Sequence, residues 1–141
     1  MIVTKQLISS ETALELVRLA LGHAKDNGWE VAVAVYDPSG HLVAFGRSDD
    51  VATPSIQFAL DKGWTAAGLG KSTDAFARRA QEKPTLAMGL GGRERLMVWG
   101  GGVAIISDGL CVGGIGVSGA SDHEDIECAQ AAIAAIGLQS G

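Results

Sequence analysis

The sequence has few prolines, few aromatic residues and few cysteines. Its three prolines stand beside twenty glycines that show no three-residue period, and this excludes a collagen-like chain. With only 5% aromatic residues, a core must be built from Val, Ile, Leu and Ala. Cys111 and Cys128 are too few for a disulfide framework, and they lack both CxxC spacing and a Cys/His pair for zinc. We therefore expect two buried free thiols.

Basic residues and long apolar runs are also scarce. Eleven Lys and Arg against sixteen Asp and Glu give a net charge of −5, so the composition does not support nucleic-acid binding. No apolar run reaches the roughly 18 residues that a membrane span needs. The N-terminus turns polar after three residues, too early for the apolar region of a signal peptide. We expect a cytoplasmic protein without membrane partners, unless a leader has been removed.

What the sequence does contain is enough apolar material for one compact domain. Hydrophobic residues make up 47% and charged residues 19% of 141 residues, a balance typical of a folded chain. This length matches a single core, since domains usually run to about 100–150 residues. Residues 1–141 are therefore predicted to form a single domain.

Periodicity and turn signals predict helices at both ends of the chain and two hairpins. An apolar stripe at helical spacing predicts a helix over residues 10–27, and a capping box of Ser121 and Glu124 begins a C-terminal helix. The turns Asp37–Gly40 and Asp108-Gly109 each separate two β-branched or apolar runs, as in hairpins. Such hairpins favour an antiparallel sheet.

The middle of the chain is predicted to contain two more helices and a loop. Residues 53–68 begin with Thr53-Pro54, a helix start, and residues 73–82 form a shorter helix. Residues 84–102 are predicted to be a long loop with one short strand near Leu96–Trp99. The expected order is αββααβββα, which defines an α+β fold with an antiparallel sheet flanked by helices.

Three side chains are candidates for binding. His23 lies at the border of the first helix's apolar stripe, where an imidazole can meet a flat apolar cofactor, although a partly buried surface histidine fits the pattern equally. Arg47 and Lys62 could hold carboxylates of a small acid or of haem propionates. For these two cations, ordinary ion pairs with nearby acids are the alternative: Asp49, Asp50 or Asp61.

Three ordered motifs together resemble the GlcG/HbpS-like family. They are the stretch Val33–Asp49, the stretch Ser55–Ala67 with Lys62, and Val112–Gly119 before Asp125. The same pattern is similar to the C-terminal domain of PduO-type corrinoid adenosyltransferases. The resemblance implies a profilin-like α+β fold, a homo-oligomer and, for several members, haem binding. Some members carry a His-Ala pair near the end of the first helix, where this chain has His23-Ala24.

The chain also departs from the family pattern. The usual Arg-Met-Asp-Gly is Arg47-Ser48-Asp49-Asp50 here, and the proline that follows the paired glycines is replaced by Val103. Polar residues beside the expected pocket favour a more polar ligand than usual.

Three functions remain open at this stage. The first is haem binding, or binding of a related tetrapyrrole, with His23 as the axial iron ligand and Arg18 or Lys25 near the propionates. The second is an isomerase, tautomerase or lyase of a catabolic operon that acts on a small organic acid. It would use Arg47 and Lys62 for the carboxylate and Gly100–Gly102 as an oxyanion nest. The third is an accessory interaction domain without chemistry.

Overall fold

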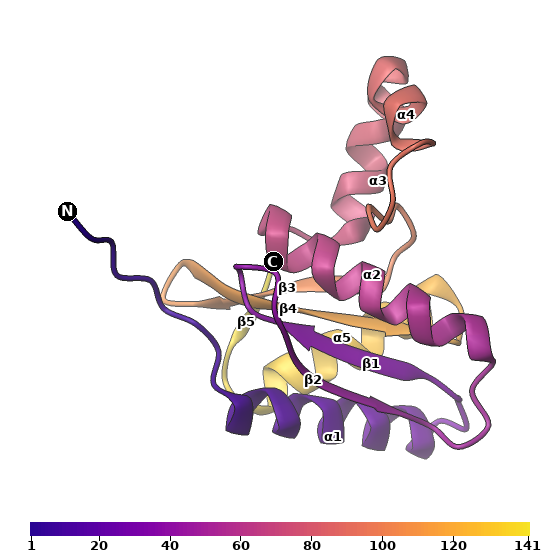
Figure 1. Cartoon of the computed structure of the whole chain (residues 1–141). Coiled ribbons are helices and arrows are strands. Elements are labelled where there is room, and N and C mark those ends of the chain that lie inside the picture. Colours follow the sequence, from indigo (N-terminus) through magenta and orange to yellow (C-terminus); the bar gives the residue numbers. More distant parts are fainter.

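The computed structural model covers residues 1–141 and contains one five-stranded antiparallel sheet (Figure 1). The strand order is β2-β1-β4-β3-β5, so the two hairpins predicted from the sequence meet where β1 pairs with β4. The strands are β1 (Ala32–Tyr36), β2 (Leu42–Arg47), β3 (Gly102–Ser107), β4 (Leu110–Ser118) and β5 (Gln139–Ser140). The predicted fold class, an α+β domain with an antiparallel sheet flanked by helices, is confirmed.

Helices cover both faces of the sheet. On one face, α1 (Ser10–Asp26) and α5 (Asp122–Ala135) lie side by side, and α2 (Thr53–Leu69) crosses the other face (Figure 1). The main apolar cluster lies under α1 and α5, because the inward stripe of α1 packs on β1 and β2 while α5 packs on β3 and β4. Leu16, Val33 and Ile115 are fully buried in it. None of the helices is both long and apolar enough to cross a membrane.

The α2 face is packed differently, with backbone close to backbone. A Cβ added at Gly116 of β4 would lie 2.2 Å from the carbonyl oxygen of Ala59 and 2.3 Å from the nitrogen of Gly63. A Cβ at Gly114 would lie 2.4 Å from the nitrogen of Ala67. Gly114 and Gly116 of β4 are therefore required by the close approach of α2.

The turn between β1 and β2 is organised by Asp37. Its Oδ1 accepts hydrogen bonds from the backbone N–H groups of Ser39 (2.9 Å) and His41 (3.1 Å). Its Oδ2 lies 3.2 Å from Nδ1 of His41. Asp37 thus satisfies the turn's own donors, as Asp commonly does at this position.

The segment 84–102 differs from its prediction. Pro84–Leu90 forms the helix α4, because proline is well suited to a first helical turn, and no strand forms near Leu96–Trp99. Instead, Thr65 of α2 holds this segment: its hydroxyl donates to the Arg95 carbonyl (2.8 Å) and accepts from the Met97 N–H (3.1 Å). Hydrogen bonds to the Thr65 side chain take the place of the backbone hydrogen bonds that a strand would make with a neighbouring strand.

The element order therefore needs two corrections. The predicted order αββααβββα placed a strand where α4 and an irregular segment stand, and it lacked the two-residue strand β5 at the C-terminal end. Helix α3 (Thr73–Glu82) and α4 together form an arm that projects away from the body of the molecule (Figure 1).

Candidate functional site

His23 lies in the last turn of α1, at the seam between α1 and α5. Its neighbours Ala20 and Ala24 point into the core, so the imidazole stands at the edge of the buried stripe with 31% of its side chain exposed. Its Nε2 lies 2.7 Å from Oε2 of Glu127 on α5. The ring also contacts Trp29, with centroids 6.0 Å apart and a tilt of 58°. The imidazole is therefore held in position by an acid and an aromatic ring.

A shallow depression of about 310 Å³ surrounds His23 along the α1–α5 seam. Its floor is made of small residues, Gly22 on α1 and Ala131 and Ala135 on α5, with Leu19 beside them. A Cβ at Gly22 would meet nothing within 4 Å, so no side chain covers this surface. The depression offers a small apolar surface next to the imidazole, and the charged residues Arg18 and Asp26 also line it.

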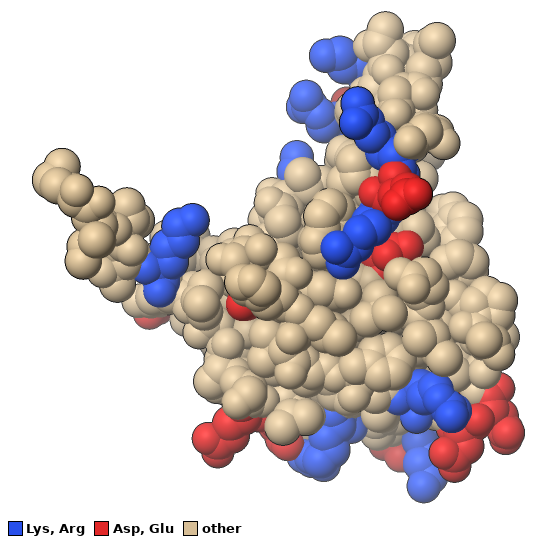
Figure 2. Space-filling view, viewed as in Figure 1, with Lys and Arg blue, Asp and Glu red and all other residues tan.

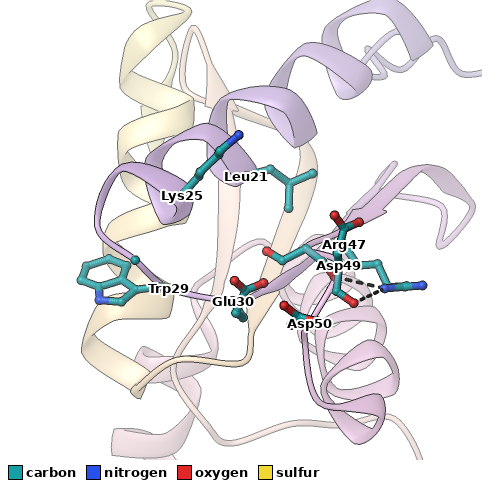
Figure 3. Close-up of a pocket in the computed structure, with 9 residues that line it drawn as sticks. Leu21, Lys25, Trp29, Glu30, Arg47, Asp49 and Asp50 are labelled. Carbon is teal, nitrogen blue, oxygen red and sulfur yellow. Dashed lines mark hydrogen bonds between the residues drawn. The ribbon is translucent and has the colours of Figure 1, made fainter.

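Arg47 lies in a neighbouring pocket of about 300 Å³ at the end of β2 (Figure 3). Its Nη1 donates to the backbone carbonyls of Ser48 (3.1 Å) and Asp49 (3.0 Å). Leu21 and Lys25 of α1 line the opposite wall. Acidic side chains also surround the pocket, at positions Glu30, Asp49 and Asp50.

Trp29 links the two depressions. It lines the Arg47 pocket, and its ring packs against the ring of His23. His23 and Arg47 therefore lie on neighbouring surfaces at one end of α1, although they do not line the same pocket. No sequence pattern marks Trp29 or Glu127 as a site residue, because each is placed beside the histidine by a tertiary contact.

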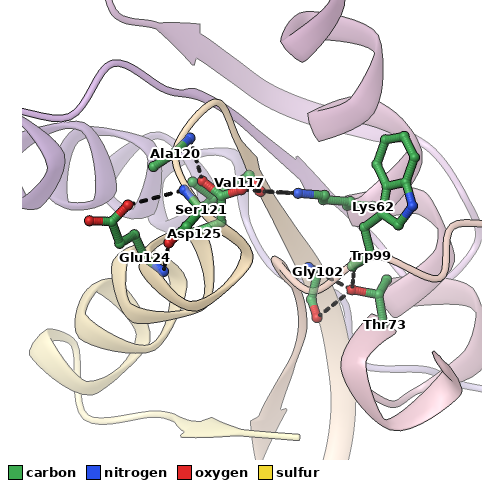
Figure 4. Close-up of polar contacts among 9 residues, drawn as sticks. All are labelled: Lys62, Thr73, Trp99, Gly102, Val117, Ala120, Ser121, Glu124 and Asp125. Atoms are coloured by element: carbon green, nitrogen blue, oxygen red, sulfur yellow. Dashed lines mark hydrogen bonds and ion pairs between the residues drawn. The ribbon is translucent and has the colours of Figure 1, made fainter. Parts of the chain in front are cut away.

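Lys62 has a different environment, inside the molecule. Only 1% of the residue is exposed, and its Nζ donates to the Val117 carbonyl (3.0 Å) and to Oδ2 of Asp125 (3.1 Å) (Figure 4). Oδ1 of Asp125 accepts from the Ala120 N–H at 3.0 Å. Burial raises the pKa of Asp125, and the Lys62 ammonium opposes that rise.

The ion-pair partners that the sequence suggested for Lys62 are therefore wrong. The ammonium is bonded to Asp125, 63 positions away, and not to Asp49, Asp50 or Asp61. Lys62 lines neither the depression beside His23 nor the pocket that holds Arg47. Its prediction as a ligand-binding residue stays a prediction, and its observed contacts tie α2 to β4 and α5.

The glycine run 100–102 lies beside this ion pair and is buried. A Cβ at Gly101 would lie 2.3 Å from the Val117 carbonyl oxygen and 2.8 Å from Nζ of Lys62. Thr73 of α3 holds the run, since its hydroxyl accepts from the Gly102 N–H (2.9 Å) and donates to the Trp99 carbonyl (2.7 Å) (Figure 4). The expected oxyanion nest is thus closed off by packing and is not open to a substrate.

A family model described as "Haem degrading protein HbpS-like" matches residues 8–134. The chain belongs to the HbpS-like family. It is 31% identical to Protein GlcG of Escherichia coli strain K12 over 82% of this chain and 84% of that protein. It is 30% identical to the corrinoid adenosyltransferase PduO of Citrobacter freundii over 94% of this chain, but it spans only 40% of PduO.

A solved structure shares the fold closely. The crystal structure of the PduOC:Heme complex has a TM-score of 0.88 and 30% identity, and the match covers 95% of this chain and 98% of that one. The HbpS-like fold described above is thus the fold of a protein crystallised with haem.

Proposed function

We propose that this chain binds haem, with His23 as the axial ligand of the iron. The observation that carries the proposal is a partly exposed imidazole beside an open, small-residue depression on the α1–α5 seam. Imidazole is an axial ligand of haem iron in many proteins, and the apolar porphyrin ring is stabilised by apolar protein surface beside that ligand. The PduOC:Heme relative supports the choice of this cofactor.

The residues around His23 fit the chemistry of haem. Leu19, which lines the same depression, and the Trp29 ring, which packs against the imidazole, supply apolar contact near His23. Lys25 and Arg47 supply cations for the two propionates at the same end of α1. Arg18 is already bonded to Glu15 through Nε (2.8 Å) and Nη2 (2.5 Å), so Lys25 and Arg47 are the better candidates for the propionates.

The role of the protein is to bind the haem and to orient it. Bound haem would supply an iron centre for redox and ligand chemistry. His23 would fix the iron, and the α1–α5 surface would shield one porphyrin face from water. The HbpS-like family is described as haem degrading, and binding is the step for which this chain presents residues.

We also propose that the protein acts in the cytoplasm, in a catabolic or redox-response pathway. Cell fractionation tests the location. Transcript levels measured after adding hemin, an oxidant or a carbon source test the pathway.

An enzyme acting on a small organic acid is not proposed further. That function needs Arg47 and Lys62 to face one carboxylate, and Lys62 is enclosed by its bonds to Val117 and Asp125. An accessory domain without chemistry is the reading that remains if haem does not bind.

Hemin titration of the purified chain tests the proposal. The wild type should give a saturable Soret band, and His23→Ala should bind more weakly with a shifted maximum while its circular dichroism stays unchanged. His123→Ala is the matched control, because His123 is exposed at the start of α5 and should leave the titration unaltered. No saturable band in the wild type contradicts haem binding, and an unchanged His23→Ala spectrum removes His23 from the site.

A further inference from the structure

Arg95 has a left-handed backbone, which is rare for a residue other than glycine. Its φ is 73°, and Asp108 in the turn between β3 and β4 is the only other non-glycine residue with a positive φ. Arg95 belongs to the return segment, residues 91–101, which leads from α4 back to β3. Because a Cβ crowds the backbone in this region, the conformation persists only where contacts with the rest of the molecule enforce it.

The guanidinium of Arg95 makes such contacts, on two aromatic rings of the body. Its Cζ lies 4.3 Å from the ring centroid of Trp64 on α2 and 5.9 Å from that of Tyr36 on β1. Its Nη2 is 3.4 Å from the Tyr36 hydroxyl oxygen, and its Nε is 3.9 Å from Oδ1 of Asp61 on α2. Stacking on aromatic faces suits a planar guanidinium. Figure 2 shows side chains of both charges next to one another where the arm joins the body.

The backbone of Arg95 is held by Thr65, a different residue of α2. The Thr65 hydroxyl donates to the Arg95 carbonyl and accepts from the Met97 N–H. Thr65 is 1% exposed, so water does not compete for these two bonds. Rotation of Arg95 out of the left-handed region would reorient its carbonyl. The side-chain contacts and the two Thr65 bonds are therefore coupled through the conformation of one residue.

The residues that follow Arg95 line an apolar depression of about 470 Å³. Leu96, Val98 and Trp99 form one side of it, and side chains of α3 and α4 form the other. The conformation of Arg95 thus sets the position of one wall of this depression.

We propose that Arg95 is a latch that switches the return segment between two states. In the latched state, the contacts with Trp64 and Tyr36 offset the strain in the Arg95 backbone. The Arg95 side chain is 42% exposed, so it can leave the rings without unfolding the body. The backbone then relaxes, both Thr65 bonds break together, and the wall of the depression is released from α2. This inference is independent of haem binding.

Hydrogen exchange of the Met97 amide tests the latch, because this N–H is bonded to Thr65 only in the latched state. Arg95→Ala removes the guanidinium but keeps a Cβ in the strained region, so the amide should exchange about tenfold faster than in the wild type. Arg95→Gly removes the strain as well, and its exchange should be about fivefold slower than that of Arg95→Ala. Arg93→Ala is the matched control, since Arg93 is exposed and its φ is not positive.

A change on the opposite side of the contact tests the coupling. Trp64→Leu should also speed Met97 exchange, and adding Arg95→Ala to it should have little further effect. The Val117 amide in β4, which donates to the Gly101 carbonyl, reports whether each variant keeps its fold. With Val117 protection intact, unchanged Met97 exchange in Arg95→Ala, equal exchange in the alanine and glycine variants, or additive effects of the two changes would each overturn the proposal.

Discussion

His23 in the last turn of α1 and Glu127 within α5 are 104 positions apart in the sequence, and Nε2 of His23 lies 2.7 Å from Oε2 of Glu127. Both side chains are partly exposed, at 31% and 47%, so the pair is worth less than about 1 kcal/mol. It lies at the edge of the depression proposed for haem. If the iron took Nε2, the carboxylate of Glu127 would compete with it for that ring nitrogen.

This competition predicts a gain of affinity on removing the acid. Glu127→Ala should bind hemin up to about fivefold more tightly, because the exposed pair that must be broken costs up to about 1 kcal/mol. Hemin titration at fixed pH measures the change. Asp122→Ala is the control on the same helix, because Asp122 is exposed and takes no part in the capping box of Ser121 and Glu124. A fall in affinity would show that Glu127 orients the ring while the iron takes Nδ1.

Removing the buried cation should destabilise the fold. Lys62→Met leaves the carboxylate of Asp125 buried without its partner, and we expect a loss of about 3–5 kcal/mol in the free energy of unfolding. Urea denaturation at neutral pH measures it. The double variant Lys62→Met/Asp125→Asn should lose less than Lys62→Met alone, because the amide removes the charge and its oxygen still accepts from Ala120. Additive effects would contradict this coupling.

Asp37 should make the free energy of unfolding depend on pH in the acidic range. Burial alone would raise the pKa of Asp37, but the hydrogen bonds from the His41 and Ser39 N–H groups and from the His41 ring outweigh it and lower that pKa below its ordinary value of 3.8. A lowered pKa means that the folded state favours the carboxylate. The stabilisation is therefore complete above the unfolded pKa and is lost as pH falls through the folded pKa.

The Asp37→Asn variant tests this sign. At neutral pH it should be less stable than the wild type, and the difference should shrink as the pH falls below about 4. Urea denaturation between neutral and acid pH measures both curves. A difference that stays constant over this range would mean that the charge of Asp37 does not contribute.

The contact between α2 and β4 should tolerate no added methyl group. Gly116→Ala would place Cβ against the backbone of Ala59 and Gly63, and we expect a loss of more than about 3 kcal/mol or failure to fold. Gly68→Ala in α2 is the control, since its Cβ would meet nothing within 4 Å and alanine favours the helix by about 1 kcal/mol. Thermal melts of both variants measure the difference. Similar melting temperatures would contradict the close approach.

Local signals explain which parts of the fold were predictable. Helix α1 and both hairpins were predicted because apolar spacing and turn residues lie within a few positions of each other. Helix α4 has no buried residue, so it leaves no apolar periodicity to detect. The run Leu96–Trp99 has the composition of a strand, but the bonds from Thr65 decide its conformation.

The candidate site was predictable only in part. The position of His23 at the edge of the helical stripe follows from counting residues, and the structure places the imidazole there. Its contacts with Trp29 and Glu127 depend on how α5 and the segment after α1 pack, which no local pattern encodes. For Lys62 the same limit applies, because Asp125 is 63 positions away.

The backbone contact between α2 and β4 restricts how this protein can vary. Where side chains separate two elements, a larger residue on one side can be balanced by a smaller one on the other. No side chain lies between Gly116 and the turn of α2 from Ala59 to Gly63, so no smaller residue can make room for a larger one at Gly116. A substitution there is accommodated only if the whole of α2 moves. That helix carries Lys62 and Thr65, which hold α5 and the segment leading out of the arm. A substitution at the contact between α2 and β4 would thus displace α5 and the segment after the arm together.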